Sequence, residues 1–322
     1  MKTNLLSIVV TTYNEERKND IFELLNSVRK QTYPDIEVVI VVEESITFLS
    51  AIEGHLRTLG LTYKAIFSEG IRGISYARNL GVVNASGEII AIVDDDALLS
   101  ADWAKALMET YNEHPEAIGV TGQAIPLWVN PSDSWFPKQL YWMIGCTDWR
   151  GWNSERQTNV TSGVNMSFRA ETFKIARFPT SLGAGASTEG KLGFPNEDND
   201  FAMTITGLTN RPIVYIPDVI VYHKVYPYRL HSRYIRKYAF WQGCAEARYS
   251  DMWYSRGERE FLRLRLLREL LADVTLSFFR DLTYTRETAS KKAKILILVL
   301  SFLGIGYVAY KLGLHRYVAR II

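Results

Sequence analysis

Residues 87–96 read GEIIAIVDDD, a nearly continuous run of aliphatic side chains that ends in three consecutive aspartates. Aliphatic runs of this kind, without polar alternation, are typical of strands that are buried on both faces of a parallel sheet. Two similar runs come earlier, LLSIVV at residues 5–10 and IEVVIVV at residues 36–42, and polar residues follow both. The three runs predict neighbouring strands of one parallel sheet.

The segments between these strands have the spacing of helices. Apolar side chains lie three and four positions apart at residues 21–28, and helical patterns also occupy residues 50–59 and 73–83. Strands that alternate with helices predict an α/β fold of Rossmann type, with a mostly parallel central sheet and helices on both faces. Sites in such folds form beyond the carboxyl ends of the strands. Polar clusters follow three of the predicted strands, at residues 12–15, 43–45 and 94–96.

The charge of the chain is unevenly distributed. The whole chain has a net charge of +2, whereas residues 256–322 carry 13 Lys and Arg against 6 Asp and Glu, which is +7 and leaves −5 for residues 1–255. An acidic body with a basic, apolar tail favours anionic lipid headgroups as a partner. It argues against nucleic acid, which would need a basic groove interleaved with aromatic residues across the body. A solvated helix face is the alternative interpretation of the basic tail.

Two segments of the tail predict contact with a membrane. Residues 261–282 (FLRLRLLRELLADVTLSFFRDL) have the pattern of an amphipathic helix at a membrane interface. Residues 295–310 carry no charge and are flanked by lysines, but they are fewer than the roughly 20 residues of a typical span. A re-entrant or monotopic anchor, or a short span, fits this length, and a buried core helix is the alternative. We therefore expect a helical, membrane-associating region at residues 226–322.

Cysteine usage and the N-terminal segment bear on the compartment. The chain has two cysteines, Cys146 and Cys244, and its first apolar run is too short for a secretory signal. Two cysteines form no disulfide framework and fit a reducing environment. These features predict a location at the cytoplasmic face of the cell membrane.

The three aspartates at residues 94–96 predict a metal site. Adjacent carboxylates at a strand end repel one another and raise one another's pKa unless a cation neutralises them. A divalent metal bound to a nucleotide diphosphate would neutralise them, and oxygen ligands favour Mg²⁺ or Mn²⁺. An exposed acidic turn before a helix that begins near Asp102 is the alternative interpretation.

Several motifs taken together are more specific than any one of them. Their order along the chain is IVVTTYNEE at residues 8–16, Arg78-Asn79, the aspartates at 94–96, and Glu197-Asp198. This ordered set resembles the inverting family 2 glycosyltransferases, which have the GT-A fold, over about residues 5–223. Within that family the chain is most similar to archaeal enzymes that extend dolichyl-phosphate-linked sugars, such as the glucosyl-dolichyl phosphate glucuronosyltransferases. The segments that carry this similarity are residues 139–147, 162–169, 222–225 and 240–243.

The resemblance implies an enzyme that transfers a sugar from a nucleotide-sugar, UDP-linked, to a lipid-linked acceptor of the dolichyl phosphate type. Residues 1–225 would form the nucleotide-sugar-binding and catalytic domain. The resemblance assigns a metal contact to Asp96 and the role of general base to Asp198, because inverting transfer needs a carboxylate that takes the acceptor's hydroxyl proton. A helix N-terminal cap is the alternative role for Asp198, and Asp200 is the competing base.

Further contacts to the metal, the donor and the acceptor follow from the same resemblance. His223 is expected near the metal or the diphosphate, although a lone histidine is often structural. Contacts to the donor nucleotide are expected from Thr11, Tyr13, Glu15, Glu43, Arg78, Asp94 and Asp95. Contacts to the acceptor or the diphosphate are expected from Asn165, Glu197, Lys224, Arg229, Arg233 and Trp241. For the basic and aromatic residues beyond position 225, a solvated helix face is the alternative.

Two other functions compete with sugar transfer. A nucleotidyltransferase has a similar core, but it usually opens with a Gly-rich loop and a basic residue, whereas the first strand here leads into TYNEE at residues 12–16. A non-catalytic, membrane-docked protein that binds a nucleotide-sugar is the other alternative. The retention of Asp94, Asp96 and Asp198 argues against it, because a non-catalytic relative does not need these carboxylates.

Overall fold

The computed structural model describes residues 5–69, 71–148, 151–183, 195–252, 286–319 and 321–322. The chain forms two compact units, one of Met1–Leu127 and Gly145–Lys224 and the other of Trp128–Ile144 and Val225–Ile322. The second unit thus takes a short internal segment from within residues 1–225. The predicted amphipathic helix at residues 261–282 lies outside the described residues.

The first half of unit 1 alternates strands and helices. In chain order these are β1 (Leu6–Thr12), α1 (Lys18–Arg29), β2 (Ile36–Val42), α2 (Ile46–Leu59), β3 (Thr62–Phe67), α3 (Ile74–Asn84) and β4 (Ile89–Asp94). Strand β1 pairs in parallel with β2 and with β4, and β2 pairs in parallel with β3. The predicted α/β fold and its parallel strands are confirmed.

The second half of unit 1 extends the same sheet with antiparallel strands. Its elements are β5 (Ala97–Leu99), α4 (Trp103–Glu113), β6 (Gly119–Trp128), β7 (Arg156–Thr158), β8 (Met166–Arg169), α5 (Thr172–Ile175), α6 (Glu197–Thr209) and β9 (Ile213–Val225). The strand order of the nine-stranded sheet is β3-β2-β1-β4-β8-β6-β9-β5, and β7 pairs with β9. Strand β8 is antiparallel to both β4 and β6, and β9 is antiparallel to β5 and β7. The sheet is therefore mixed, and its parallel part is the block β3-β2-β1-β4.

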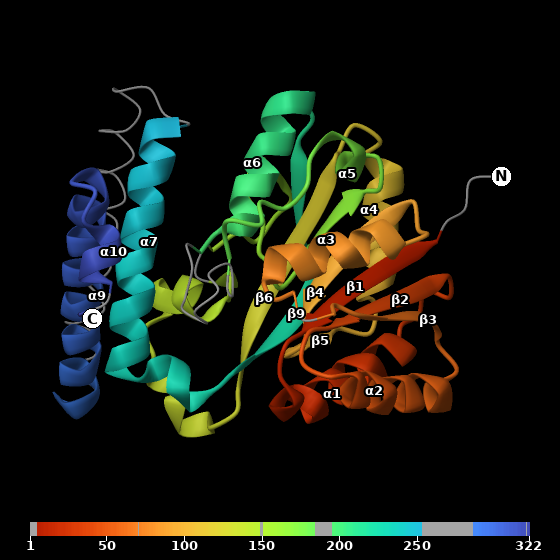
Figure 1. Ribbon diagram of the computed structural model, residues 1–322, viewed down its shortest axis with the longest axis horizontal. Helices are drawn as coiled ribbons and strands as arrows, with labels where there is room; N and C mark the ends of the chain where they lie inside the picture. Colours follow the sequence, from red (N-terminus) through yellow and green to blue (C-terminus); the bar gives the residue numbers. More distant parts are fainter. Residues whose placement is uncertain (1–4, 70, 149–150, 184–194, 253–285, 320) are drawn as a thin grey trace. The chain divides into compact units, whose positions relative to one another are not determined.

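Alternating side chains of the parallel strands build a core on each face of the sheet. Ile8 and Val10 of β1 belong to the cluster that includes side chains of α1, α2 and α4, whereas Val9 belongs to the cluster that includes side chains of α3 and α6. Figure 1 shows α1 and α2 on one face of β1–β3 and α3 on the other. Burial on both faces explains why these strands are aliphatic at nearly every position.

Capping residues fix the ends of α2. The hydroxyl of Ser45 accepts a hydrogen bond from the backbone N–H of Phe48, which satisfies one of the free donors at the helix start. Gly60 ends the helix in the left-handed conformation, with φ of 62°. These local signals help α2 to start just after the carboxyl end of β2 and keep the polar residues there at the sheet edge.

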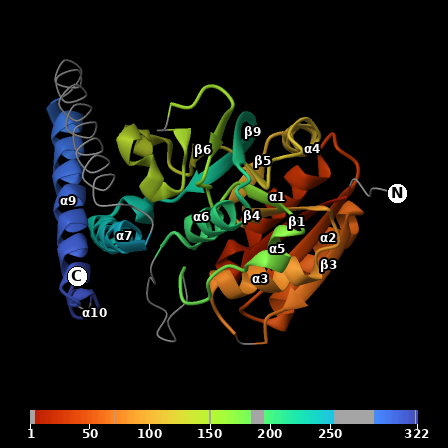
Figure 2. The same ribbon diagram turned by 90° about the horizontal axis from the view of Figure 1, so that it is seen from above.

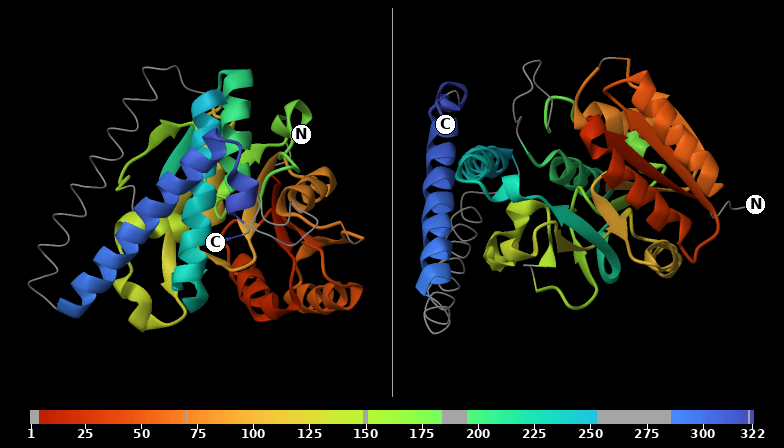
Figure 3. Two further views of the ribbon diagram at one scale, coloured as in Figure 1. Left: turned by 60° about the vertical axis from the view of Figure 1, so that its left-hand side comes forward. Right: turned by 90° about the horizontal axis from the view of Figure 1, so that it is seen from below.

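Unit 2 is helical. Its described elements are η2 (Pro131–Trp135), η3 (Lys138–Ile144), η5 (Pro227–Leu230), α7 (Ser232–Met252), α9 (Arg286–Lys311) and α10 (His315–Val318). Helices α7 and α9 cross obliquely and lie against each other, as Figures 2 and 3 show. Glycines permit this approach, because a Cβ added at Gly243 would lie 2.1 Å from the Leu303 carbonyl oxygen and one at Gly306 would lie 1.9 Å from that of Phe240.

Helix α9 contains the uncharged residues 295–310 that predict a membrane anchor. Within it, Ser290–Lys311 are long and apolar enough to cross a membrane, with a mean hydropathy of 2.0. Only 22% of this window is buried in the protein. Length and composition alone do not distinguish a membrane helix from a helix that packs inside a soluble protein.

Candidate active site

The carboxyl ends of β1, β2 and β4 meet at one edge of the sheet. Thr11 lies opposite Asp94 in the pairing of β1 with β4, and it lies opposite Val41 in the pairing with β2. The backbone N–H of Glu43 donates to the carbonyl of Thr12 at 3.0 Å. The polar clusters that follow the three strands are therefore neighbours in space, as parallel pairing of the strands requires.

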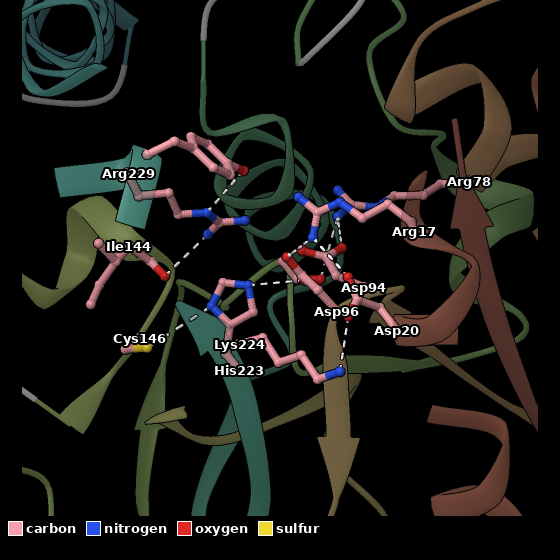
Figure 4. A network of polar contacts seen from close by, with 12 residues as sticks. Arg17, Asp20, Arg78, Asp94, Asp96, Ile144, Cys146, His223, Lys224 and Arg229 are labelled. Atoms are coloured by element: carbon pink, nitrogen blue, oxygen red, sulfur yellow. Dashed lines mark hydrogen bonds and ion pairs between the residues drawn. The ribbon is translucent and has the colours of Figure 1, made fainter. Parts of the chain in front are cut away.

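Pairing of β5 with β9 brings His223 to the aspartates. Ala97 lies opposite His223, and the backbone N–H of Lys224 donates to the carbonyl of Asp96 at 2.9 Å. The imidazole Nε2 of His223 is then 3.1 Å from Oδ1 of Asp96. Ligand atoms of Asp94, Asp96 and His223 all lie within 4.8 Å of one another, and Figure 4 shows their side chains converging. Two carboxylates and an imidazole at this spacing suit a divalent cation.

The other side of the His223 ring faces Gly145 and Cys146. The Sγ atom of Cys146, which is buried, is 3.9 Å from Nδ1 of His223. Gly145 has φ of +74°, and a Cβ added there would lie 2.7 Å from Cε1 of the imidazole. Glycine is needed at this position because the backbone is left-handed and the ring lies directly against it. The imidazole is therefore held between Asp96 on one side and this segment on the other.

Arg17 is a site residue that sequence analysis did not identify. Its guanidinium Nη1 is 2.9 Å from Oδ2 of Asp96 and 3.3 Å from Oδ2 of Asp20. Asp20 also accepts from Nζ of Lys224 at 2.9 Å, and Lys224 forms a second ion pair of 2.9 Å with Glu23. Lys224, which was expected to contact the acceptor or the diphosphate, is buried in this ion-pair network (Figure 4).

Arg78 connects the aspartates with the beginning of α6. The guanidinium is almost completely buried, with Nη2 at 3.0 Å from Oδ1 of Asp94 and Nη1 at 2.6 Å from Oε1 of Glu197. Nη2 also donates to the carbonyl of Gly163 at 3.3 Å. Arg78, expected to contact the donor, thus links three separate segments of the chain through buried charge.

Burial perturbs the carboxylic acids around Arg78. Burial raises the pKa of Glu197 to about 7, while Arg78 acts in the opposite direction. Burial also raises the pKa of Asp198, although Arg78 and hydrogen bonds from the backbone N–H groups of Asn199 and Gly163 favour its ionised form. A carboxylate with a raised pKa is a stronger proton acceptor than one in water, which is the property a general base needs.

Asp95, the middle aspartate of the three, is buried. Burial raises its pKa to about 7, and the adjacent Asp96 carboxylate adds to the rise. Among the described residues its Oδ2 atom is buried without a hydrogen-bond partner. The predicted repulsion within the aspartate cluster is therefore present, and Arg17 and Arg78 balance the charges of Asp96 and Asp94.

The expected nucleotide contacts lie along the same sheet edge with different exposures. Tyr13 is 57% exposed and Glu15 is exposed, whereas Glu43 is buried and accepts from the backbone N–H of Gly73 at 3.0 Å. Burial raises the pKa of Glu43. Thr11 is half-buried beside Asp94. These four side chains come from the ends of β1 and β2, which are the elements that the sequence assigns to the nucleotide.

Asn165 lies in the interior of unit 1. Its Oδ1 accepts from the Trp103 indole at 3.0 Å, and its Nδ2 donates to the carbonyls of Gln123 and Val219 at 3.1 and 2.8 Å. The side chain is 1% exposed. Its polar atoms therefore hold α4, β6 and β9 together around the site.

The remaining expected contacts belong to unit 2. Arg229, in η5, is half-buried and donates from Nη1 to the carbonyl of Ile144 at 3.3 Å. Arg233 is exposed and Trp241 is half-buried, both on α7. The structure thus brings together, in unit 1, the residues expected to contact the donor and the metal, and it places Arg229, Arg233 and Trp241 in unit 2.

Comparison with known proteins identifies the family. Residues 7–179 match the glycosyl transferase family 2 domain, which is more than half of the chain. The chain belongs to glycosyltransferase family 2. The match contains all of β1 after Leu6, together with Arg78 and the aspartate cluster, and it confirms the resemblance seen in the sequence. Membership of this family favours sugar transfer over the nucleotidyltransferase and non-catalytic alternatives.

One sequence relative and two structural neighbours cover most of the length of this glycosyltransferase. It is 29% identical over 306 residues to the glucosyl-dolichyl phosphate glucuronosyltransferase of Haloferax volcanii, which covers 94% of this chain and 95% of that protein. Among solved structures, a mannosyltransferase from Pyrobaculum calidifontis in complex with GDP-Man and Mn²⁺ superposes with a TM-score of 0.62 at 20% identity, over 94% of this chain and 86% of that one. TarS of S. aureus in complex with UDP-GlcNAc superposes with a TM-score of 0.53 at 19% identity, over 96% and 92%. These structural neighbours confirm the GT-A type of fold.

Proposed function

We propose that this family 2 glycosyltransferase is an inverting, metal-dependent enzyme that transfers a hexose, such as glucuronate, to a lipid-linked acceptor of the dolichyl phosphate type. The donor would be a UDP-linked sugar, and the reaction would take place at the cytoplasmic face of the membrane. The observation that carries this proposal is the convergence of Asp94, Asp96 and His223 at the sheet edge, where Arg78 connects Asp94 to Glu197, the residue before Asp198.

The three candidate ligand residues fit a divalent cation, Mg²⁺ or Mn²⁺. Three ligand atoms from Asp94, Asp96 and His223 lie within 4.8 Å of one another, and the site is rich in carboxylate oxygen. Such an ion would neutralise the charge that develops on the departing diphosphate. Arg17 already contacts Asp96 at 2.9 Å, so a second cationic group is available at the same carboxylate.

Asp198 would act as the proton acceptor. Inverting transfer is one in-line displacement in which the acceptor hydroxyl loses its proton as it attacks the anomeric carbon. Asp198 is half-buried at the start of α6, and its Oδ2 would lie 3.3 Å from a Cβ added at Gly163. The glycine therefore lets the backbone approach and donate to the carboxylate. Glu197, which binds Arg78, positions the start of this helix.

The acceptor proposal rests on the relative and on unit 2. The Haloferax volcanii protein, which covers nearly the whole chain, is named a glucosyl-dolichyl phosphate glucuronosyltransferase. Helix α9 offers an apolar segment of sufficient length to contact a membrane. A nucleotide-sugar in the first unit and a lipid-linked acceptor at the second would account for both units.

Donor-dependent thermal stabilisation of the full chain in detergent tests the proposal. UDP-, GDP- and dTDP-sugars are compared with and without Mn²⁺, and we expect a metal-dependent rise of the melting temperature with a UDP-sugar. Asp96→Asn should abolish this rise, whereas Asp198→Asn should retain it, because Asp198 acts on the acceptor. No shift with any donor in folded protein would refute the donor and metal assignments, and an equal shift without Mn²⁺ would refute the metal alone.

A further inference from the structure

A row of five aromatic side chains in unit 2 forms a continuous surface next to a basic residue. We call it the aromatic ladder, and its members are Tyr226, Tyr228, Tyr234, Tyr238 and Trp142. We infer that the aromatic ladder, together with Arg229, binds the phosphate end of an isoprenoid lipid. The inference rests on the proposed function, because it locates the lipid-linked acceptor of that function on the chain.

The rings contact one another in sequence. Centroids of Tyr226 and Tyr228 are 6.1 Å apart, those of Tyr228 and Tyr234 are 5.8 Å apart, and those of Tyr234 and Tyr238 are 5.8 Å apart. Trp142 completes the row at 6.1 Å from Tyr238. The rings come from the segment before η5, η5 itself, α7 and η3, so four parts of unit 2 contribute to one surface.

The aromatic ladder is not the packed face of α7. The buried side chains of this helix, including Ile235, Ala239 and Gly243, lie at other positions, and Gly243 is in contact with α9. Tyr234 and Tyr238 are half-buried, and Tyr228 is 43% exposed. Part of each of these side chains is thus exposed, and each ends in a phenol hydroxyl. A surface of this kind suits an apolar chain that ends in a polar group.

Arg229 supplies the charge that such a ligand requires. Its guanidinium carbon is 6.0 Å from the centroid of the Tyr228 ring, and Nη1 is fixed by the carbonyl of Ile144. Arg233, four residues further on, is exposed at the start of α7. Nε of Arg229 also donates to the Tyr228 hydroxyl at 3.4 Å, so the charge is held at the ring. A guanidinium binds phosphate oxygens through charge-assisted hydrogen bonds. An arginine beside a row of rings therefore complements an anion that is joined to a hydrocarbon chain.

Along the chain, the tyrosines of the aromatic ladder begin shortly after the proposed metal ligand His223. Tyr226, the first ring, comes three residues after His223, and the strand β9 that carries His223 ends at Val225. A free nucleotide diphosphate would use the arginine but would leave the rings without a role. An isoprenoid phosphate uses both, and each additional five-carbon unit that contacts a ring would add apolar area to the interface.

Binding of farnesyl phosphate to the full chain in detergent tests the inference without any transfer reaction. Isothermal titration calorimetry would compare farnesyl phosphate with isopentenyl phosphate, farnesol, glucose 1-phosphate and inorganic phosphate. We expect farnesyl phosphate to bind at least tenfold more tightly than each of the others. The double substitution Tyr228→Ala with Tyr234→Ala should weaken its binding about tenfold or more, and Arg229→Gln should do the same while the fold is retained.

Tyr222→Ala is the matched control, because Tyr222 is 38% exposed on β9 and is not part of the ladder. The inference is overturned if this control weakens binding as much as the ladder variants, or if Arg229→Gln leaves the affinity unchanged. Equal binding of glucose 1-phosphate would instead indicate a sugar site and would also overturn it. Donor-dependent stabilisation of the same proteins separates the two proposals: its absence in wild type refutes the proposed function, whereas the farnesyl phosphate affinities test the ladder.

Discussion

Removal of the Arg78 guanidinium should destabilise unit 1 in a pH-dependent way. Arg78 is almost completely buried and pairs with Glu197 at 2.6 Å and with Asp94 at 3.0 Å. Breaking one buried ion pair typically costs about 3–5 kcal/mol, because the partner charge remains buried. The Asp94 carboxylate is 31% exposed and water screens it, so we discount its pair and attribute most of the loss to Glu197. Arg78→Met should therefore lower the free energy of unfolding by about 3–5 kcal/mol at pH 8.

The pH dependence follows from the raised pKa of Glu197. Its pKa is about 7 in the folded protein, so the side chain is mainly ionised at pH 8 and mainly protonated at pH 5.5. Because pH 8 lies about one unit above this pKa, ionisation of Glu197 can add only about 1.4 kcal/mol to the loss, and the rest of the loss is present at both pH values. The loss in Arg78→Met should thus be clearly larger at pH 8 than at pH 5.5.

Urea unfolding followed by circular dichroism at both pH values measures the effect. Arg169→Met is the matched control, because this guanidinium donates to the backbone carbonyls of Ala117, Tyr111 and His114. Its loss should depend little on pH between 5.5 and 8. A loss below about 1 kcal/mol for Arg78→Met at pH 8, or the same loss at both pH values, would refute the buried ion-pair interpretation.

Three further predictions concern the metal site and unit 2. Cys146→Ala should weaken Mn²⁺ binding about tenfold in calorimetry, because Sγ of Cys146 is 3.9 Å from Nδ1 of His223. Groups that orient a ligating histidine typically contribute 10–100-fold to metal affinity. An unchanged affinity would exclude this role for Cys146. Asp95 has a folded pKa of about 7, above its unfolded value, so its contribution to stability is complete at low pH and is lost as pH rises through 7. Without metal, the stability of Asp95→Asn relative to wild type should thus increase between pH 5 and pH 8. A stability difference that decreases as the pH rises would contradict this. Gly243→Ala should lower the thermal midpoint of unfolding, because the added Cβ would meet α9. Gly304 has open space around it, so Gly304→Ala should be tolerated or should stabilise the protein by up to about 1 kcal/mol. The same midpoint for both variants would argue against close packing of α7 on α9.

The parallel part of the fold could be predicted because its strands are buried on both faces. Residues 87–96 and the two earlier aliphatic runs became β4, β1 and β2, and the polar residues after them meet at one edge. Burial on both sides leaves a signal at every position of a strand. Strands β5, β7 and β8 have three or four residues each, and such short segments have no periodicity that a sequence can reveal.

The aspartate cluster could be predicted from one short motif, whereas Arg17 and Cys146 beside it could not. Arg17 reaches Asp96 across 79 positions, and within TYNEER it reads as one more charge on a surface turn. Cys146 contacts His223 across 77 positions and carries no motif of its own. The pairing of β1 with β4 brings Arg17 toward Asp96, whereas the pairing of β5 with β9 and the course of the segment after η3 bring Cys146 and His223 together. Arg78 was expected to contact the donor, because a sequence motif identifies the residue but does not reveal that its side chain is buried.

The most direct test of the central assignment is the rate of sugar transfer by Asp198→Asn at saturating donor and metal. Donor-dependent stabilisation of the same variant is measured in parallel. Asparagine keeps the shape of the side chain but cannot accept the acceptor's proton, and loss of a general base typically lowers the rate about 10²–10⁴-fold. We predict a decrease in this range with donor-dependent stabilisation like that of wild type. A rate within about threefold of wild type, in protein that still binds the donor, would contradict the assignment of Asp198 as the base.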